Sequence, residues 1–392
     1  KERGKSARVV PLCYKKIPAG CVEKMTICLA PPPNLLVEVI GDVFHNLHLF
    51  ANPIDKFRPS DKEIQRALKK KKGSNLIYFG PGVHNLPNDT LFVPSGTTVY
   101  IDGGARVYGN IFTEGAHDVN IFGRGEVHPD GRGAGVWVRR SKNVRIDGIV
   151  VSQLPIGQCD SVELTNVKSI SYSGWGDGMD VFSSSNVILD GVFCRNSDDC
   201  AAVYASTQGF KGGSNNVLVK NATLWADVAH PINIEGHGDP TGKDTVQTVT
   251  FRNIDILDQA EKQVDYQGCL AINPGDNPLV RNITFEHIRI EDFRHGQLVN
   301  FSISFNPKHC VSTGRGIQNV LVKDVTYNGS GENLSIIAGY DENHKISGIR
   351  FVNLVVNGRK ITDDMPGKPK WYKTGDMAGI FVGEHVENLS FE

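Results

Sequence analysis

A short phrase recurs along the chain and limits its possible folds more than any other feature. Each copy is a β-branched strand, a polar pair that often contains Asn or Gly, and a second short strand. The copies begin at Lys142 (KNVRIDGIVV), Ser185 (SNVILDGVFC), Asn215 (NNVLVKNATL), Gln247, Arg281, Gln318 and Ser347. They stand roughly 30 to 40 residues apart, and the wider first interval has room for another copy around DSVELTNVKSISY. Their alternation of apolar and polar positions predicts strands with one buried face.

The repeat predicts an all-β protein whose architecture is a right-handed parallel β-helix. A propeller would show a blade signature such as Trp-Asp in every repeat, and none recurs here. The variable spacing suits a β-helix, because its coils stack on one another while loops of any length leave one side. We expect rows of identical Val, Ile and Asn side chains inside the stack.

Two domains are expected, an N-terminal region of residues 1–74 and a β-helical catalytic domain of residues 75–392. The first region contains APPPNLLVEVIG and NLHLFANP, which read as short strands broken by proline and predict a small β cap or β-sandwich. It ends in SDKEIQRALKK and LKKKKG, which predict a short helix followed by a solvated linker.

Composition argues against several classes of partner. The formal net charge is -1, which gives no basic field for a nucleic acid. No apolar stretch approaches the roughly 18 to 20 residues that a membrane span needs. The eight cysteines form no CxxC pair with zinc spacing, so no metal is expected, although a pair such as Cys13 with Cys21 is conceivable. The oligomeric state cannot be read, nor can a removed signal peptide, although a start without Met fits a processed chain.

Four acids occupy two segments about one coil apart. GWGDGMDVF carries Asp177 and Asp180, and RNSDDCAAVYAS carries Asp198 and Asp199. Neighbouring coils lie roughly 4.8 Å apart, so the acids should converge. A bend at NSDD would aim both members of the pair outward. The strand interior would then be filled by Cys200, Ala202 and Tyr204 or by their alternates.

Converging carboxylates cannot all ionise, because like charges raise at least one pKa. One acid that keeps its proton and ionised neighbours are what glycoside hydrolysis requires. Three other interpretations remain open: the acids are ordinary turn residues, they belong to a calcium-dependent lyase with Arg195 as base, or the solenoid binds carbohydrate without cleaving it.

Further polar and aromatic residues fall near the same coils. WADVAHPINIEGHGDPTG begins one coil after the acid pair and carries candidate substrate-binding residues, and others flank the acids. An exposed Trp, or Tyr172, would stack on a sugar ring. The candidate substrate-binding residues are Asp180, His230, His237, Trp175, Trp225, Glu235 and Arg195.

At these residues the sequence resembles the β-helical glycosidases grouped around the polygalacturonases (family 28) and the dextranases and isopullulanases (family 49). Polygalacturonases carry Asn-Thr-Asp, Asp-Asp, Gly-His-Gly and Arg-Ile-Lys in that order. The corresponding segments here are Trp175-Gly176-Asp177, Asp198-Asp199 and Ala229-His230-Pro231, with no Arg-Ile-Lys. The missing basic motif argues against galacturonate, and NATLWADVAHPINIEG is similar to the Trp-containing coil of dextranases.

The resemblance implies hydrolysis of a polysaccharide or oligosaccharide with inversion and without a cofactor. Asp198 would be the general acid, and Asp177 and Asp199 would hold and deprotonate the water. It also implies a secreted or periplasmic enzyme. The sugar, the linkage and endo or exo action stay open.

Overall fold

The computed structural model describes residues 7–10, 34–39, 42–69, 73–129, 133–234, 236–330 and 332–392. The chain divides into two compact units, residues 1–56 and 57–392. The helix predicted within residues 1–74 lies in the second unit.

The first unit contains a small antiparallel sheet. Its strands are β1 (Ala7–Val10), β2 (Asn34–Val39) and β3 (Leu47–Phe50), and β2 pairs with both others. The consecutive apolar residues Leu35, Leu36 and Val37 of β2 are all buried, so side chains on both faces of this strand are covered. Cys13 and Cys21 lie outside the described residues.

The second unit opens with helix α1 (Asp61–Leu68). Ser60 and Glu63 form a reciprocal capping box at its N-terminus, and Ile64 is its buried residue. The sequence SDKEIQRALKK thus contains both the start signal and the single apolar contact of a short surface helix. Residues 70–72 of the basic run are outside the described residues.

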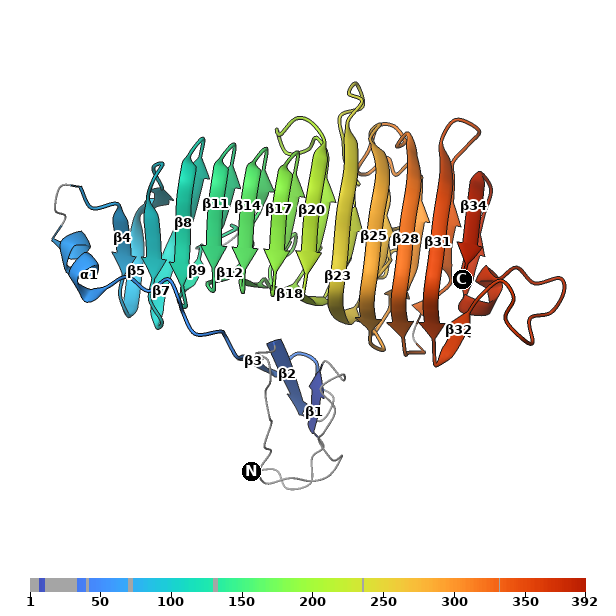
Figure 1. Ribbon diagram of the computed structural model, residues 1–392, viewed down its shortest axis with the longest axis horizontal. Helices are drawn as coiled ribbons and strands as arrows, with labels where there is room; N and C mark the ends of the chain where they lie inside the picture. Colours follow the sequence, from blue (N-terminus) through green and yellow to red (C-terminus); the bar gives the residue numbers. More distant parts are fainter. Residues whose placement is uncertain are drawn as a thin grey trace. The chain divides into compact units, whose positions relative to one another are not determined.

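The remainder of the second unit is a stack of coils built from three parallel sheets, and Figure 1 shows the successive strands crossing the body. One sheet, here called the ladder sheet, consists of β4 (Leu76–Phe79), β6 (Thr98–Ile101), β8 (His117–Gly123), β11 (Lys142–Asp147), β14 (Asp160–Thr165), β17 (Ser185–Asp190), β20 (Ser214–Lys220), β23 (Thr245–Gln259), β25 (Leu279–Ile290), β28 (Gly316–Tyr327), β31 (Lys345–Val356) and β34 (Val386–Phe391).

The chain passes from each ladder strand into a second sheet, here called the middle sheet. Its strands are β5 (Gly82–Phe92), β7 (Ala105–Glu114), β9 (Glu126–His128), β12 (Val150–Val151), β15 (Lys168–Ile170), β18 (Phe193–Asn196), β21 (Thr223–Ala226) and the ends of β23, β25, β28 and β31.

The third sheet, here called the cleft sheet, completes each coil. It follows the later parts of β5 and β7 with β10 (Val136–Arg139), β13 (Ile156–Gly157), β16 (Met179–Phe182), β19 (Ala201–Tyr204), β22 (Ile232–Ile234), β24 (Leu270–Ile272), β27 (Val299–Ser302), β30 (Ser335–Ala338) and β33 (Ile380–Val382). The predicted parallel β-helix is confirmed.

A few short elements stand outside the three sheets. They are the parallel pair β26 (Gly296–Gln297) and β29 (Glu332–Asn333), the antiparallel strand β32 (Arg359–Ile361) beside β31, and the 3-10 turns η2 (Val264–Tyr266) and η3 (Gly375–Ala378). Within the described residues, no helix is long and apolar enough to cross a membrane.

Rows of aliphatic side chains fill the coils, as expected. Val162, Val187, Val217 and Val249 are register partners on successive ladder strands, and all are buried. Each such row removes apolar surface from water, and this burial stabilises the fold by about 25 cal/mol for each Å² buried. The interior is therefore the source of the stack's stability.

The recurring Asn residues are not inside, which corrects the expected interior row. Asn186 in β17 and Asn216 in β20 each stand directly before a core valine, have φ of 57° and 56°, and are exposed. Asn216 Nδ2 donates to Asn186 Oδ1 at 2.7 Å, and Asn186 Nδ2 donates to Asp160 Oδ1 at 2.7 Å. Asn recurs there because it tolerates the left-handed conformation and its amide pairs with the next coil.

Candidate active site

The acids lie at the turn between the middle sheet and the cleft sheet, on neighbouring coils. Asp177 precedes β16, Asp198 and Asp199 precede β19, and His230 precedes β22. The backbone N–H of Gly178 donates to the carbonyl of Asp199 at 2.7 Å. This bond holds the turns of Asp177 and Asp199 in register, so residues about one coil apart in the sequence lie above one another.

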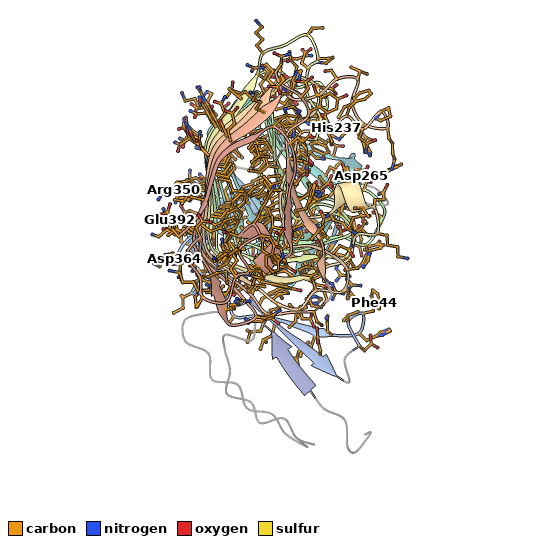
Figure 2. The ribbon with its side chains drawn as sticks, turned by 90° about the vertical axis from the view of Figure 1, so that its right-hand side faces the viewer. Phe44, His237, Asp265, Arg350, Asp364 and Glu392 are labelled. Atoms are coloured by element: carbon orange, nitrogen blue, oxygen red, sulfur yellow. The ribbon has the colours of Figure 1, made fainter. Side chains whose placement is uncertain are left out.

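Figure 2 places this turn relative to the ladder sheet. His237 and Asp265 lie on one side of the coil stack, and Arg350 and Glu392 lie on the opposite side. Arg350 is on β31 and Glu392 follows β34, so they mark the ladder sheet. The candidate site therefore occupies the face opposite the regular strands.

Three carboxylates converge at the site. One oxygen each from Asp177, Asp198 and Asp199 lie within 4.8 Å of one another. Asp199 is buried, and the other two are half-buried. The convergence that the sequence predicts is present, and it brings the acids close enough for their charges to interact strongly.

Gly178 allows the coils to approach this closely. A Cβ atom at this position would lie 2.1 Å from the carbonyl oxygen of Cys200, on the next coil. Backbone cannot move aside as a flexible side chain can, so any other residue would separate the two turns. The glycine in GDGMD is thus required between Asp177 and its strand.

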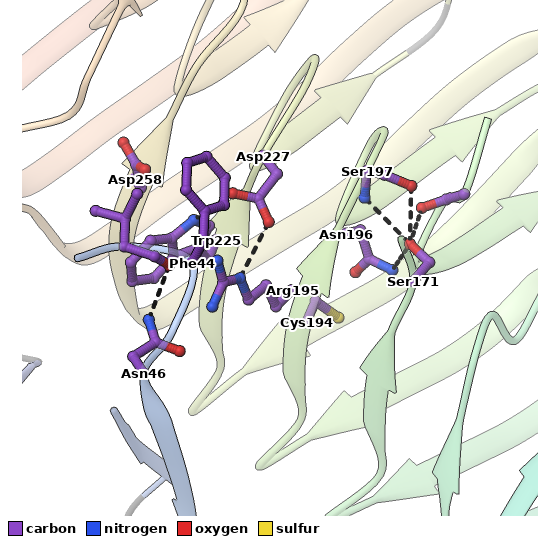
Figure 3. Close-up of polar contacts among 12 residues, drawn as sticks. Phe44, Asn46, Ser171, Cys194, Arg195, Asn196, Ser197, Trp225, Asp227 and Asp258 are labelled. Atoms are coloured by element: carbon purple, nitrogen blue, oxygen red, sulfur yellow. Dashed lines mark hydrogen bonds and ion pairs between the residues drawn. The ribbon is translucent and has the colours of Figure 1, made fainter. Parts of the chain in front are cut away.

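A buried polar network fixes the backbone beneath the acids (Figure 3). Asn196 Nδ2 donates to the carbonyl of Asp177 at 3.0 Å and to Ser171 Oγ at 3.0 Å. The N–H of Ser197 also donates to Ser171 Oγ, at 3.1 Å. Because Ser197 directly precedes Asp198, the network ties the turns of two coils together.

Asp199 is held by three neighbours. Asp199 Oδ1 lies 2.7 Å from His230 Nδ1 and accepts the N–H of His230 at 3.0 Å. Asp199 Oδ2 accepts Asn233 Nδ2 at 2.7 Å and the Tyr204 hydroxyl at 2.9 Å. Burial alone would raise the pKa of Asp199, but His230 and the hydrogen bonds from His230, Asn233 and Tyr204 together hold that pKa below its usual value.

Asp198 has the opposite tendency. Burial, and then the charge of Asp199, raises the pKa of Asp198 to about 7. Adjacent residues thus differ in protonation because one carboxylate accepts several protein hydrogen bonds and the other accepts one, from the N–H of Asp199 at 3.1 Å. Around neutral pH Asp198 carries a proton for a substantial fraction of the time while Asp199 is ionised.

Asp177 and Asp180 form a hydrogen-bonded acid pair. Burial and the neighbouring carboxylates raise the pKa of both. Their mutual hydrogen bond lowers the pKa of Asp177 and raises that of Asp180. Asp180 is also the more deeply buried of the two.

The acids open onto a solvent-accessible cleft with a volume of about 230 Å³. Trp175 is 74% exposed at its edge. A second pocket, lined in part by Tyr172, lies toward the preceding coils, and a third shares Tyr266 and His309 with the cleft. The cleft is lined by Trp175, Asp177, Asp180, Phe182, Asp198, Asp199, Tyr204, Thr207, Gln208, His237, Tyr266 and His309.

The family model of glycosyl hydrolases family 28 matches residues 136–366, which is more than half of the chain and includes every acid of the site. The chain belongs to this family. The resemblance inferred from the Asp177 and Asp198-Asp199 motifs is thereby confirmed on the polygalacturonase side.

Curated relatives agree with the family 28 assignment. The chain is 22% identical to an exopolygalacturonase from Cochliobolus carbonum over 62% of this chain and 59% of the relative. It is 24% identical to a polygalacturonase from Juniperus ashei over 67% of this chain and 54% of the relative. The chain thus spans little more than half the length of these relatives.

Solved structures share the fold of the family 28 chain. A family 28 exopolygalacturonase from Yersinia enterocolitica superposes with a TM-score of 0.59 at 13% identity, covering 93% of this chain and 84% of that one. Dex49A from Penicillium minioluteum gives a TM-score of 0.62 at 13% identity, covering 98% and 78%. The expected likeness to both groups therefore holds at the level of architecture.

Two predicted substrate-binding residues of the family 28 chain do not line the cleft. Arg195 is buried, its Nε donates to Asp227 Oδ2 at 3.0 Å, and its guanidinium lies 4.5 Å from the centre of the Trp225 ring (Figure 3). Trp225 is 2% exposed, so it cannot stack on a sugar as expected. Both project from the middle sheet, where the sequence pattern alone does not distinguish a covered face from an open one.

The other predicted residues fall in three places. Asp180 and His237 line the acid cleft, with the His237 ring 6.1 Å from that of Tyr204. His230 lines the third pocket and contacts Asp199. Glu235 lies outside the described residues.

Several cleft residues were missed or left unplaced by sequence reasoning. The sequence left open whether Tyr204 or its alternates fill the strand interior, and in the structure Ala201 and Val203 belong to the main core while Ala202 and Tyr204 belong to a separate cluster. The turn at NSDD sets this choice. Tyr266 and His309 come from loops whose sequences carry no motif.

The three converging carboxylates of the family 28 chain fit a hydrogen-bonded network better than a metal site. Three carboxylates within 4.8 Å are an arrangement that a hard cation can use. Both oxygens of Asp199 already accept protein hydrogen bonds, and Asp177 is bonded to Asp180. Loading an ion would break these bonds.

Proposed function

We propose that this chain hydrolyses glycosidic bonds of a polysaccharide or oligosaccharide, with Asp198 as the general acid. The observation that carries the proposal is the pairing of Asp198, whose pKa is raised to about 7, with an adjacent Asp199 whose pKa is lowered. A catalytic acid works best when its pKa lies near the operating pH. Protonation of the glycosidic oxygen by Asp198 would release the leaving sugar.

The water nucleophile has two acceptors in this proposal. Asp177 and Asp199 lie within 4.8 Å of each other and of Asp198, so one water can hydrogen-bond to both. Burial raises the pKa of Asp177, and the hydrogen bond with Asp180 acts in the opposite direction and favours the ionised form of Asp177. Asp177 or Asp199 would take the proton of the water as it attacks the anomeric carbon.

Inversion of the anomeric centre is part of the proposal, from the implied roles of the three acids. Inverting enzymes usually separate their carboxyl groups by about 6.5 to 9.5 Å, and retaining ones by about 5 to 5.5 Å. The nearest oxygens here are closer than either range. The stereochemistry therefore has to be measured directly, by NMR of the first product anomer.

The lyase alternative lacks its predicted base at the site. A lyase needs a basic residue to remove a proton next to a uronate, and Arg195 was the candidate. Arg195 is buried and ion-paired with Asp227 at 3.0 Å. Among the described residues, the cleft lining includes no Lys or Arg. Hydrolysis is therefore the better supported reaction.

The names of the relatives support a plant or microbial polysaccharide as the substrate class, since they are polygalacturonases. Polymers of this kind are degraded outside the cell, so a secreted or periplasmic location belongs to the same proposal. The whole protein's activity is proposed and not carried over, because the chain spans little more than half of these relatives.

The proposal is tested by incubating the chain with a panel of neutral glucans, galactans and pectic oligosaccharides. We expect new reducing ends and saturated products, separated by chromatography. Unsaturated products that absorb ultraviolet light would identify a lyase instead. Binding that persists for days without any product would identify a non-catalytic solenoid.

A further inference from the structure

The charge of the cleft is one-sided. Its lining contains Asp177, Asp180, Asp198 and Asp199 and, among the described residues, no Lys or Arg. The adjoining pocket that shares Tyr266 adds Asp265 and again no Lys or Arg from the described part of the chain. A sugar bound at the acids therefore meets carboxylates that no lysine or arginine of the described lining offsets.

Lys211 and Arg195, which lie near lining residues in the sequence, are ion-paired elsewhere, whereas the charge of Lys308 acts on the lining residue His309. Lys211 follows two lining residues along the chain, but its Nζ lies 2.8 Å from Asp239 Oδ2. Arg195 precedes the acid pair and is ion-paired with Asp227 at 3.0 Å. Moving either into the cleft would break an existing ion pair.

The imidazole of His309 does not supply the missing charge either. Burial, together with His237 and Lys308, lowers the pKa of His309 below its usual value. His309 is therefore neutral at pH 7 and above. It can donate or accept a hydrogen bond to a hydroxyl, as a neutral sugar requires.

A carboxylate on the substrate would be strongly disfavoured in the cleft. At about 6 Å from an ionised Asp199 and an effective dielectric of about 20, repulsion would weaken binding by roughly a hundredfold. It would also raise the proton affinity of Asp198 further. A polyuronate enzyme would need a fixed cation at this point.

The cleft offers neutral recognition in place of charge. Trp175 presents an exposed ring, and Tyr266 also lines the cleft. Thr207 and Gln208 add a hydroxyl and an amide. Aromatic faces with neutral donors and acceptors are suited to the C–H faces and hydroxyls of an uncharged hexose.

We infer that the sugar unit bound beside Asp198 is uncharged, so that the substrate is a neutral glycan and not a polyuronate, although the named relatives are polygalacturonases. The inference rests on the proposed function, because it concerns the same cleft. It narrows that function from any polysaccharide to one without carboxylates at the cleavage point.

The test compares matched oligosaccharides that differ only in charge. Oligogalacturonides and oligoglucuronides are each paired with their carboxyl-reduced forms, and binding to Asp198→Asn is measured by calorimetry. This variant removes a negative charge, so the comparison is biased toward the uronates. We expect at least one neutral member to bind at least about tenfold more tightly than its uronate partner.

A cation introduced into the cleft should narrow that difference. Thr207→Lys adds a charge to the lining, and Thr207→Gln is the control with a neutral side chain of similar reach. We expect the lysine variant alone to improve uronate binding, by about tenfold. Uronate binding that equals or exceeds neutral binding in every pair overturns the inference, as does an unchanged ratio in the lysine variant.

The outcomes also separate the inference from the proposed function. Hydrolysis of a uronate oligomer by the wild-type chain, lost in Asp198→Asn, overturns the inference and leaves the proposed function intact. Failure of every oligosaccharide to bind contradicts both. Cleavage confined to neutral oligosaccharides supports both.

Discussion

The ladder sheet and the acid turns occupy opposite faces of the coil stack and use polar residues in opposite ways. On the ladder face, Asn186 and Asn216 repeat one chemistry, stand exposed, and pair amide to amide at 2.7 Å. On the other face, each coil supplies a different group, such as Asp177, Asp199 or His230, and two of these are buried. The same periodicity therefore positions repeated groups for stability and unlike groups for chemistry.

The difference follows from what each arrangement costs. An exposed amide ladder satisfies its own donors and acceptors and leaves charge out of the protein. The acid turns concentrate carboxylates that repel one another, and Asp199 is 2% exposed. Such a cluster is expected to reduce stability, and it persists only with a specific set of hydrogen bonds. Changes on the two faces should therefore have separable effects.

The largest expected effect is loss of the proposed acid. Asp198→Asn keeps the shape but removes the titratable proton, and we expect at least about a hundredfold lower kcat. Asp190→Asn is the matched change on the ladder face, where Asp190 Oδ1 accepts Asn221 Nδ2 at 2.7 Å. Its rate should be unchanged. A comparable loss of rate in both variants would contradict the division between the faces.

Loss of one support of Asp199 should have a smaller effect. Tyr204→Phe removes the hydroxyl that donates to Asp199 Oδ2 at 2.9 Å. A hydrogen bond to a charged group contributes roughly 1.5 to 3 kcal/mol, so about a tenfold lower kcat is expected, with the acid limb of the pH profile moved to higher pH. The limb moves upward because the pKa of Asp199 rises when a donor to its charged form is lost.

Tyr78→Phe provides the comparison away from the cleft. Tyr78 donates to Asp102 Oδ2 at 2.7 Å, the same type of bond on the early coils. This variant should unfold at a slightly lower urea concentration with an unchanged pH profile. An unmoved acid limb in Tyr204→Phe would show that Tyr204 has only a structural role.

The pH dependence should show a moderate effect. Asp198 must be protonated to act, and burial and Asp199 raise its pKa to about 7. The protonated fraction falls as the pH rises, so kcat/KM should fall about fivefold between pH 7 and 8. Initial rates across this range measure the limb. A profile that stays flat to pH 9 would exclude Asp198 as the acid.

The smallest effect on rate is expected on the ladder. Asn216→Ala removes the donor to Asn186 Oδ1 and places alanine at a φ of 56°, a left-handed conformation that asparagine tolerates better than alanine. We expect about 1 to 2 kcal/mol of lost unfolding free energy and an unchanged kcat. Asn216→Gly removes the same donor without the strain, so its urea midpoint should lie between those of Asn216→Ala and the parent. Reduced kcat in either variant would couple the two faces.

Much of the fold is readable from local pattern. The copies beginning at Ser185 and Asn215 give strand length, burial and spacing because each coil satisfies the same requirements as its neighbour. The helix after Ser60 is readable because its capping box is local. The spacing of one coil between Asp177 and Asp198 also gives their convergence.

The rest of the site depends on contacts that no local pattern records. The outward face of Tyr204 is set by the turn before β19, and a shift of one residue reverses every side chain of a strand. Trp225 and Arg195 cover each other, so neither is available to substrate as the sequence suggested. His309 reaches the cleft from a loop far along the chain.

By itself, the sequence determines the repeating coil and the positions of the acids on it, because a period of one coil converts sequence distance into spatial proximity. Only the tertiary structure decides which acid keeps its proton. Asp198 and Asp199 are neighbours of the same residue type, and their pKa values are moved in opposite directions by burial and by donors from His230, Asn233 and Tyr204 on other parts of the stack.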